Sequence, residues 1–141
     1  MSSQLPRAVI CDIDGTLALH GGRSPFDWHR VLEDAPNMPV IELVQILAAQ
    51  GVTIIYTSGR DEVCRRDTRT WLDDFVGVPG PLLMRSRDDN RKDSAVKKEL
   101  YKKYIRDSYR VLFVLDDRNQ VVDLWRDDLG LACFQVAPGD F

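Results

Sequence analysis

Short apolar runs alternate with longer segments of helical pattern along the chain. The apolar runs have the length and content of buried strands and occupy residues 8–11, 52–57, 81–84, 111–115 and 132–136. The segments between them space their apolar residues at helical intervals and occupy residues 38–51, 65–77, 93–105 and 119–130. Strands that alternate with helices predict an α/β fold, in which a parallel sheet of about five strands carries helices on both faces.

Length and composition narrow the class of protein. The chain has 141 residues, 44% of them hydrophobic, and a net charge of −3. This predicts one domain over residues 1–141 and gives no general argument for a nucleic-acid or membrane partner. Three scattered cysteines do not form a disulfide framework, and no apolar stretch is long enough to span a membrane. We therefore expect a cytoplasmic protein with reduced thiols and no membrane contact.

Polar side chains gather where the predicted strands end. Ligands of such sheets bind at the carboxyl ends of the strands. The groups expected there, in chain order, are Asp12, Asp14, Ser58, Arg60, Lys92, Asp116 and Asp117. Each group is weak evidence alone, but two acidic pairs that directly follow two apolar strands are hard to explain by structure only.

Simpler explanations exist for each group. Asp12 could begin a calcium-binding loop, but the sixth position holds Leu17 instead of glycine and the twelfth holds Arg23 instead of glutamate. Ser58 could cap a helix, and Lys92 lies in a charged run where a solvated lysine is usual. The second acidic pair could also cap the helix that follows it, although capping does not explain two such pairs.

Phosphoryl transfer suits this combination of groups. A carboxylate that attacks a phosphate meets like-charge repulsion of about 4 kcal/mol per pair of unit charges at a separation of about 4 Å. Magnesium held by oxygen ligands from two strand ends removes that repulsion. A lysine and a hydroxyl can bind the remaining phosphate oxygens, and a carboxylate two residues after the nucleophile can transfer the proton.

The order of these motifs resembles that of the haloacid dehalogenase (HAD) superfamily: "DIDGT" at 12–16, then Ser58, Lys92 and the pair at 116–117. Five further segments, "GGRSPFDW", "TSGRDE", "RTWLDDFVGVP", "RKDSAVKKELY" and the C-terminal "LDDRNQVVDLWRDDLGLACFQVAPGDF", are similar to the phosphatase half of phage-type polynucleotide kinase-phosphatases. The resemblance covers nearly the whole chain, from residue 9 to residue 141, and implies a HAD-like domain.

The resemblance implies a role for each matched residue. Asp12 is the nucleophile that forms an aspartyl-phosphate, and Asp14 is the general acid and then the general base. Mg²⁺ is bound by Asp12, the backbone carbonyl of Asp14, and Asp117. The remaining implied roles are phosphate binding by Ser58 and Lys92, substrate binding by Arg23 and Arg60, and support by Asp116 and Asp89.

The spacing of the motifs also bears on the substrate. Neither the roughly 20 residues after Thr16 nor the short run before Lys92 could fold as a cap domain. An uncovered site could admit the end of a polymer. Together with this, the resemblance implies a magnesium-dependent polynucleotide 3′-phosphatase that acts on DNA or RNA ends. The alternatives are a HAD phosphatase of small nucleotides or sugars and, less well supported, a receiver-like domain that accepts a phosphoryl group.

The sequence has no GxxxxGK[ST] phosphate-binding loop of the kind that the kinase half of the family carries. We therefore expect either a stand-alone phosphatase or one whose partner, a polynucleotide kinase or ligase, is a separate protein.

Overall fold

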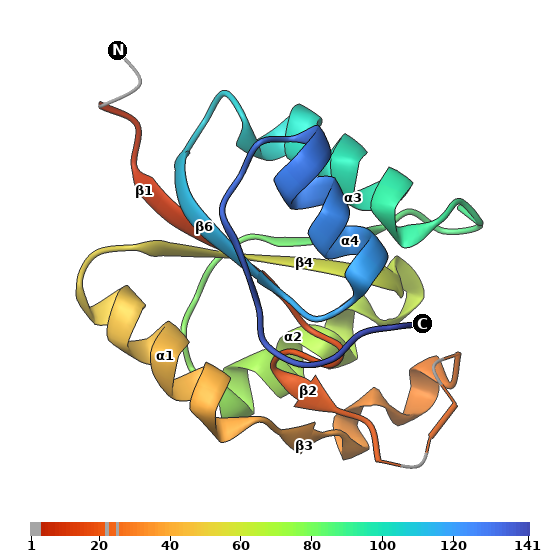
Figure 1. Ribbon diagram of the computed structural model, residues 1–141. Helices are drawn as coiled ribbons and strands as arrows, with labels where there is room; N and C mark the ends of the chain where they lie inside the picture. Colours follow the sequence, from red (N-terminus) through yellow and green to blue (C-terminus); the bar gives the residue numbers. More distant parts are fainter. Residues whose placement is uncertain (1–3, 22, 25) are drawn as a thin grey trace.

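A five-stranded parallel sheet forms the centre of the molecule (Figure 1). The computed structural model describes residues 4–21, 23–24 and 26–141. The strands are β1 (Arg7–Asp12), β4 (Thr53–Asp61), β5 (Leu82–Arg85), β6 (Arg110–Asp116) and β7 (Cys133–Gln135). Their order across the sheet is β5-β4-β1-β6-β7. All five apolar runs therefore form strands, as the sequence predicts.

Helices cover both faces of the sheet (Figure 1). One face carries α1 (Met38–Ala49) and α2 (Arg65–Phe75), which follows the short η3 (Glu62–Cys64). The other carries α3 (Asp93–Leu100) with its π-helical continuation η4 (Tyr101–Ile105), and α4 (Asn119–Asp123) with its continuation η5 (Leu124–Asp128). Across the described part of the chain, we find no helix with both the length and the apolar character that a bilayer crossing demands.

Alternate residues of the strands build two separate cores. In β1, Val9 and Cys11 pack toward α1 and α2, whereas Ala8 and Ile10 pack toward η4 and α4. Successive side chains of a strand point to opposite faces, so a run that is apolar at every position is buried on both sides. This accounts for the unbroken apolar runs in the sequence.

A small antiparallel ribbon of β2 (Ala18–Leu19) and β3 (Ala35–Pro36) lies outside the main sheet. Between its strands the chain forms the 3₁₀ helix η2 (Trp28–Glu33). The ribbon and η2 are the secondary structure described between β1 and α1, so this part of the fold contains no cap domain. The sequence did not predict the ribbon, because two-residue strands show no periodicity.

The chain changes direction across the sheet beside β1. It passes from β1 to β4 and β5 on one side, then returns to β6 and β7 on the other. The crevice at such a switch point, at the carboxyl ends of the strands, is where open α/β sheets bind ligands. Here Asp12, at the end of β1, lies close to Asp116 and Asp117, at the end of β6.

Candidate active site

A cleft of about 1070 Å³ opens at the carboxyl ends of β1, β4 and β6. It contains most of the residues predicted from the sequence: Asp12, Asp14, Arg60, Asp89, Lys92, Asp116 and Asp117. Ser58 is fully buried and Arg23 nearly so. The structure therefore brings the strand-end residues together at one place, although their contacts differ from those expected in several respects.

The turn after β1 is tightly built. Gly15 has φ +80°, a left-handed conformation that an L side chain rarely adopts. A Cβ atom at this position would also overlap the carboxylate of Asp117. Thr16, the next residue, donates a hydrogen bond from Oγ1 to Asp12 Oδ2 at 3.0 Å. The glycine thus lets the carboxylate from β6 approach the backbone that follows β1.

Three buried carboxylates form a cluster on one side of this turn. Each of Asp12, Asp116 and Asp117 offers an oxygen within 4.8 Å of the others. Lys97 Nζ lies 2.7 Å from Asp12 Oδ1 and 3.0 Å from Asp116 Oδ2. Burial and the neighbouring Asp116 raise the pKa of Asp12 well above its usual value, although Lys97 opposes this.

The cluster has the composition of a site for a hard divalent cation. Three carboxylates face one ammonium group, which leaves a formal excess of two negative charges when all are ionised. The donors are all oxygen atoms, which Mg²⁺ and similar cations prefer over sites built from nitrogen or sulfur. Asp12 and Asp117 were both predicted as metal ligands. Asp116, expected only to support them, offers its own oxygen to the same cluster.

The lysine beside Asp12 is Lys97, not the predicted Lys92. Lys92 is exposed, lines the cleft and precedes the first residue of α3. Lys97 lies just over one turn further along α3, next to Val96 on the buried side of the helix, and is 2% exposed. Burial lowers the pKa of Lys97, but the charges of Asp116 and Asp12 more than compensate and raise it overall.

The carboxylate of Asp14 lies in the opposite electrostatic environment. Arg60 binds it through two nitrogens, with Nη2 2.7 Å from Oδ1 and Nε 3.0 Å from Oδ2. Arg23 Nη2 lies 3.3 Å from the same Oδ1. Burial favours the neutral carboxyl, but the hydrogen bond and charge of Arg60, together with Arg23, lower the pKa of Asp14 overall.

Asp34 joins the two arginines and was missed by the sequence analysis. Its Oδ1 lies 2.7 Å from Arg23 Nε and its Oδ2 lies 2.8 Å from Arg60 Nη2. Trp71 in α2 donates from Nε1 to the backbone carbonyl of Asp34 at 3.0 Å. This residue is buried and follows η2. Its contacts depend on how η2 packs on α2, which no local pattern reveals.

The acidic residue near Lys97 in this segment also differs from the predicted one. Asp89 was expected to support the lysine, but its ion pair is with Arg91, at 2.7 Å. Asp93 is instead the acid whose charge helps to raise the pKa of Lys97. It also binds Arg118 Nη1 at 2.8 Å and forms an ion pair with Arg85.

Ser58 is fully buried and does not line the cleft in the described structure. It belongs to β4, which pairs with β1 on the side opposite β6. Its Oγ accepts a hydrogen bond from the backbone amide of Arg60 at 3.0 Å. That bond holds the end of β4 in the conformation from which Arg60 reaches Asp14.

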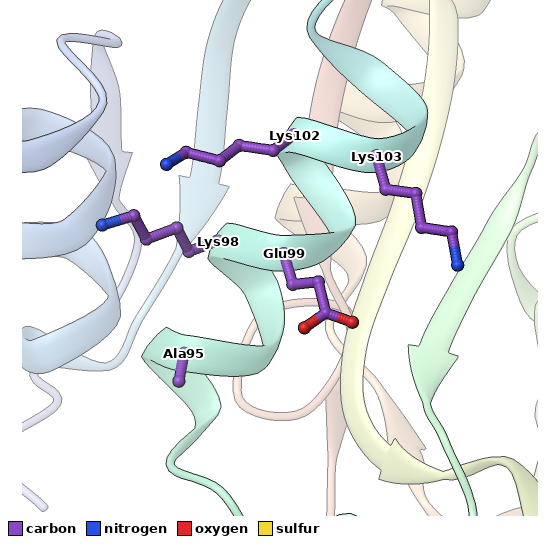
Figure 2. A pocket seen from close by; sticks show the side chains of 5 residues that line it. All are labelled: Ala95, Lys98, Glu99, Lys102 and Lys103. Atoms are coloured by element: carbon purple, nitrogen blue, oxygen red, sulfur yellow. The ribbon is translucent and has the colours of Figure 1, made fainter.

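A second hollow, of about 380 Å³, runs along the outer side of α3 and η4. Figure 2 shows that its lysines diverge: Lys98 and Lys102 extend toward α4, and Lys103 extends the other way. Lys98 forms an ion pair with Asp128, and Glu99 forms one with Arg91. These groups do not converge on a common point, so the strand-end cleft is the better candidate for chemistry.

Comparison with known proteins identifies the family of the chain. Residues 6–141 match the family model described as the polynucleotide kinase PNKP phosphatase domain. A protein of Autographa californica nuclear polyhedrosis virus that carries the name bifunctional polynucleotide kinase/RNA ligase is 40% identical over 130 residues. That alignment covers 90% of this chain but 19% of the viral protein.

Comparison with solved structures also finds proteins that share this fold. A chain from the structure titled Pnkp1/Rnl/Hen1 RNA repair complex is 46% identical, with a TM-score of 0.96. The match covers 99% of this chain and 45% of that chain, so this chain spans less than half of its structural relative. A class C acid phosphatase from Bacillus anthracis, 18% identical over 96% of this chain and 68% of its own, has a TM-score of 0.65 and shares the fold.

Proposed function

Because the chain belongs to the family of polynucleotide kinase PNKP phosphatase domains, we propose that it is a magnesium-dependent 3′-phosphatase of nucleic-acid ends. Membership of this HAD family makes the protein a hydrolase of phosphate monoesters. The observation that carries the finer proposal is the position of Asp12, held between Lys97 and Thr16 beside the carboxylates of Asp116 and Asp117. We further propose that residues 1–141 form one phosphatase domain.

Asp12 is the proposed nucleophile. Lys97 binds Oδ1 and Thr16 binds Oδ2, so the two contacts fix the carboxylate plane. Asp12, Asp116 and Asp117 would hold Mg²⁺, with the backbone carbonyl of Asp14 proposed as a further ligand; the bound cation neutralises the repulsion between carboxylate and phosphate. An Asp12 oxygen forms a bond to phosphorus while the bond from phosphorus to the leaving sugar oxygen breaks. Lys97, with Ser58 and Lys92 proposed beside it, balances charge on the phosphate oxygens.

Asp14 is the proposed proton carrier. It gives a proton to the leaving oxygen, then takes one from the water that hydrolyses the aspartyl-phosphate. Arg60 and Arg23 favour the ionised form of Asp14, which is the form that the second step needs. A phosphate that competes for these arginines would weaken their hold and raise the pKa of Asp14, as the first step requires.

The substrate is proposed to be a polynucleotide end because the described residues place no domain over the cleft, which contains several arginines, among them Arg60, Arg85 and Arg118. The relatives' names mention an RNA ligase and an RNA repair complex. RNA ends are therefore the first choice, with DNA ends as the comparison. By the same reasoning, a polynucleotide kinase or ligase is the proposed partner. We also propose that this protein is cytoplasmic, because its own three cysteines are free thiols.

The decisive experiment compares substrates that differ only in their phosphate and its carrier. The panel contains RNA and DNA oligonucleotides with a 3′-phosphate, the same strands with a 5′-phosphate, and a 3′-mononucleotide. We expect magnesium-dependent release from 3′-phosphorylated strands, with kcat/KM at least about tenfold above that for the mononucleotide, because additional phosphates bind the arginines. Equal values for oligonucleotide and mononucleotide would instead favour a phosphatase of small molecules. Asp12→Asn serves as the inactive reference.

A further inference from the structure

The cleft is larger than a phosphate group requires, and part of its wall is aromatic. His20, Phe26 and Trp28 line it together with the charged residues described above. The volume of about 1070 Å³ is at the upper end for pockets that take drug-sized ligands. The polar groups converge on the phosphate position, so the aromatic wall must face another part of the substrate.

Phe26 is exposed to an unusual degree for a residue of its type. Its side chain is 78% exposed. The ring of Phe26 meets that of Trp28 edge to face, with 6.2 Å between centroids and 83° between planes. Trp28 is itself half-buried and packs against the hydrophobic core that includes α1 and α2. The exposed ring of Phe26 therefore packs on Trp28, whose own position is held by the core.

Hydrogen bonds connect the segment that carries Phe26 and Trp28 to the polar centre of the site. Arg23, which binds Asp14 and Asp34, donates from Nη1 to the backbone carbonyl of Ser24 at 3.1 Å. Ser24 Oγ accepts from the amide of Phe26 at 3.3 Å, and the amide of Ser24 donates to Asp27 Oδ2 at 3.3 Å. The same arginine therefore positions both the proton carrier and the aromatic wall.

We propose that Phe26, supported edge to face by Trp28, forms a stacking platform for a nucleobase at the single-stranded end of the substrate. This inference rests on the proposed function and adds to it the part of the substrate other than phosphate. The exposed face of an aromatic ring beside a strongly charged phosphate site matches a nucleotide, which joins a flat base to a phosphate. Because the rings of Phe26 and Trp28 are nearly perpendicular, the base would stack on the face of Phe26, with Trp28 supporting that ring. Stacking on aromatic rings tolerates any base, so the platform gives affinity for ends without selecting a sequence.

The first test measures the contribution of the base. A 3′-phosphorylated RNA strand is compared with the same strand carrying abasic residues at its 3′ end. The measured quantity is the ratio of kcat/KM for the two. In the unmodified protein this ratio is expected to be about ten or more, mainly through KM. Phe26→Ala should bring the ratio close to one, and Phe26→Tyr should restore it.

Phe134→Ala is the matched control. Phe134 is 55% exposed and also contacts a second aromatic ring, that of Phe113, but it does not line the cleft. This control should leave the ratio unchanged. An unchanged ratio in Phe26→Ala would overturn the proposal, because Phe26 is too exposed for its loss to be masked by misfolding.

The second test needs no turnover. Of the three tryptophans, Trp71 is 1% exposed and Trp125 is fully buried, so a ligand in the cleft should quench mainly Trp28. The 3′-phosphorylated strand is titrated in the presence of a chelator, and Trp28→Phe identifies the source of the signal. Stronger quenching by base-bearing than by abasic ends is expected. Equal quenching would overturn the platform even if phosphatase activity is present.

The two proposals can fail separately. If the protein shows no preference for oligonucleotides over mononucleotides, the proposed substrate is wrong. The platform would still be supported if a 3′-mononucleotide quenches Trp28 and ribose phosphate does not.

Discussion

Two carboxylates that lie two residues apart, Asp12 and Asp14, occupy opposite electrostatic environments. Asp12 shares a buried cluster with two further carboxylates and one lysine, and its pKa is raised, first by burial and then by Asp116. Asp14 is bound by two arginines that outweigh the effect of burial and lower its pKa. The Asp12 side therefore has an excess of negative charge, whereas on the Asp14 side the two arginines balance the carboxylates of Asp14 and Asp34.

The difference indicates how one short motif can serve two purposes. On the Asp12 side, a surplus of carboxylate oxygens matches a divalent cation. On the Asp14 side, Arg23 and Arg60 can exchange a protein carboxylate for a phosphate oxygen, since both anions fit the guanidinium fork. Residue type alone does not distinguish Asp12 from Asp14; the side chains brought from α3, β4, β6 and the segment after β2 do.

The comparison is tested most directly by removing each charge in turn. Asp12→Asn should lower kcat by about 10⁴-fold or more, because the nucleophile and a proposed metal ligand are lost together. Asp14→Asn should lose turnover but still form some phospho-enzyme with an aryl phosphate, whose leaving group needs no proton. Rapid-quench measurement of phospho-enzyme separates the two. Asp128→Asn, an exposed carboxylate of η5, is the control. Substantial activity in Asp12→Asn would contradict the covalent mechanism.

The next largest effect should distinguish the two lysines. Lys97→Met should lower kcat by about 10³-fold, as expected for loss of a donor that stabilises charge in the transition state. Lys92→Met, which alters an exposed side chain, should have a much smaller effect and act mainly on KM. Steady-state kinetics with a 3′-phosphorylated strand measure both. Lys98→Met, on the same helix but outside the cleft, is the control.

Thermal unfolding of Lys97→Met should also be followed, because the change leaves Asp12 and Asp116 without their cation. Lys92→Met could prove the more damaging variant while Lys97→Met remains folded and active. In that case, the burial of Lys97 between Asp12 and Asp116 does not mean that it takes part in catalysis.

On the Asp14 side of the turn, Arg60→Lys should lower kcat/KM by about 10²-fold. A lysine carries the charge but cannot bind both oxygens of Asp14 and reach Asp34 and Thr68 as well. Activity is compared with that of Arg30→Lys, which alters an exposed arginine paired with Glu33. Full rescue by lysine would mean that charge alone is needed there.

The smallest expected effect is a loss of affinity for the cation. Asp117→Asn should raise the magnesium concentration for half-maximal rate by about tenfold or more, while the rate at saturating magnesium falls less than in the variants above. The measurement is a magnesium titration of initial rates. Undiminished activity of the unmodified protein in excess chelator would exclude a bound cation at the acidic cluster.

Sequence patterns were sufficient for the sheet because its strands are buried on both faces. The run around Ile10 is apolar at every position and the run around Ile55 nearly so, and this signal is independent of the rest of the fold. The β2–β3 ribbon has no such signal. It forms because the amide of Asn37 donates to the carbonyl of Leu17 and the chain folds back between them, which a periodicity analysis cannot detect.

The site was only partly predictable for a related reason. Asp12 and Asp117 follow apolar strands directly, so their position is given by the strand that precedes them. Lys97 lies within a helix, where only its place beside the buried Val96 marks it among several lysines. That signal was present in the sequence and was missed. Asp34, in contrast, acquires its role from contacts across three elements, and these appear only in the folded chain.

Gly15 has a consequence for the way this protein tolerates change. It carries no functional group, yet a methyl group at this position would occupy the space of the Asp117 carboxylate in a backbone conformation that already disfavours side chains. In a complete substitution library selected for activity, position 15 should therefore be as intolerant as position 12. The site therefore depends on the absence of a side chain at position 15 as much as on its carboxylates.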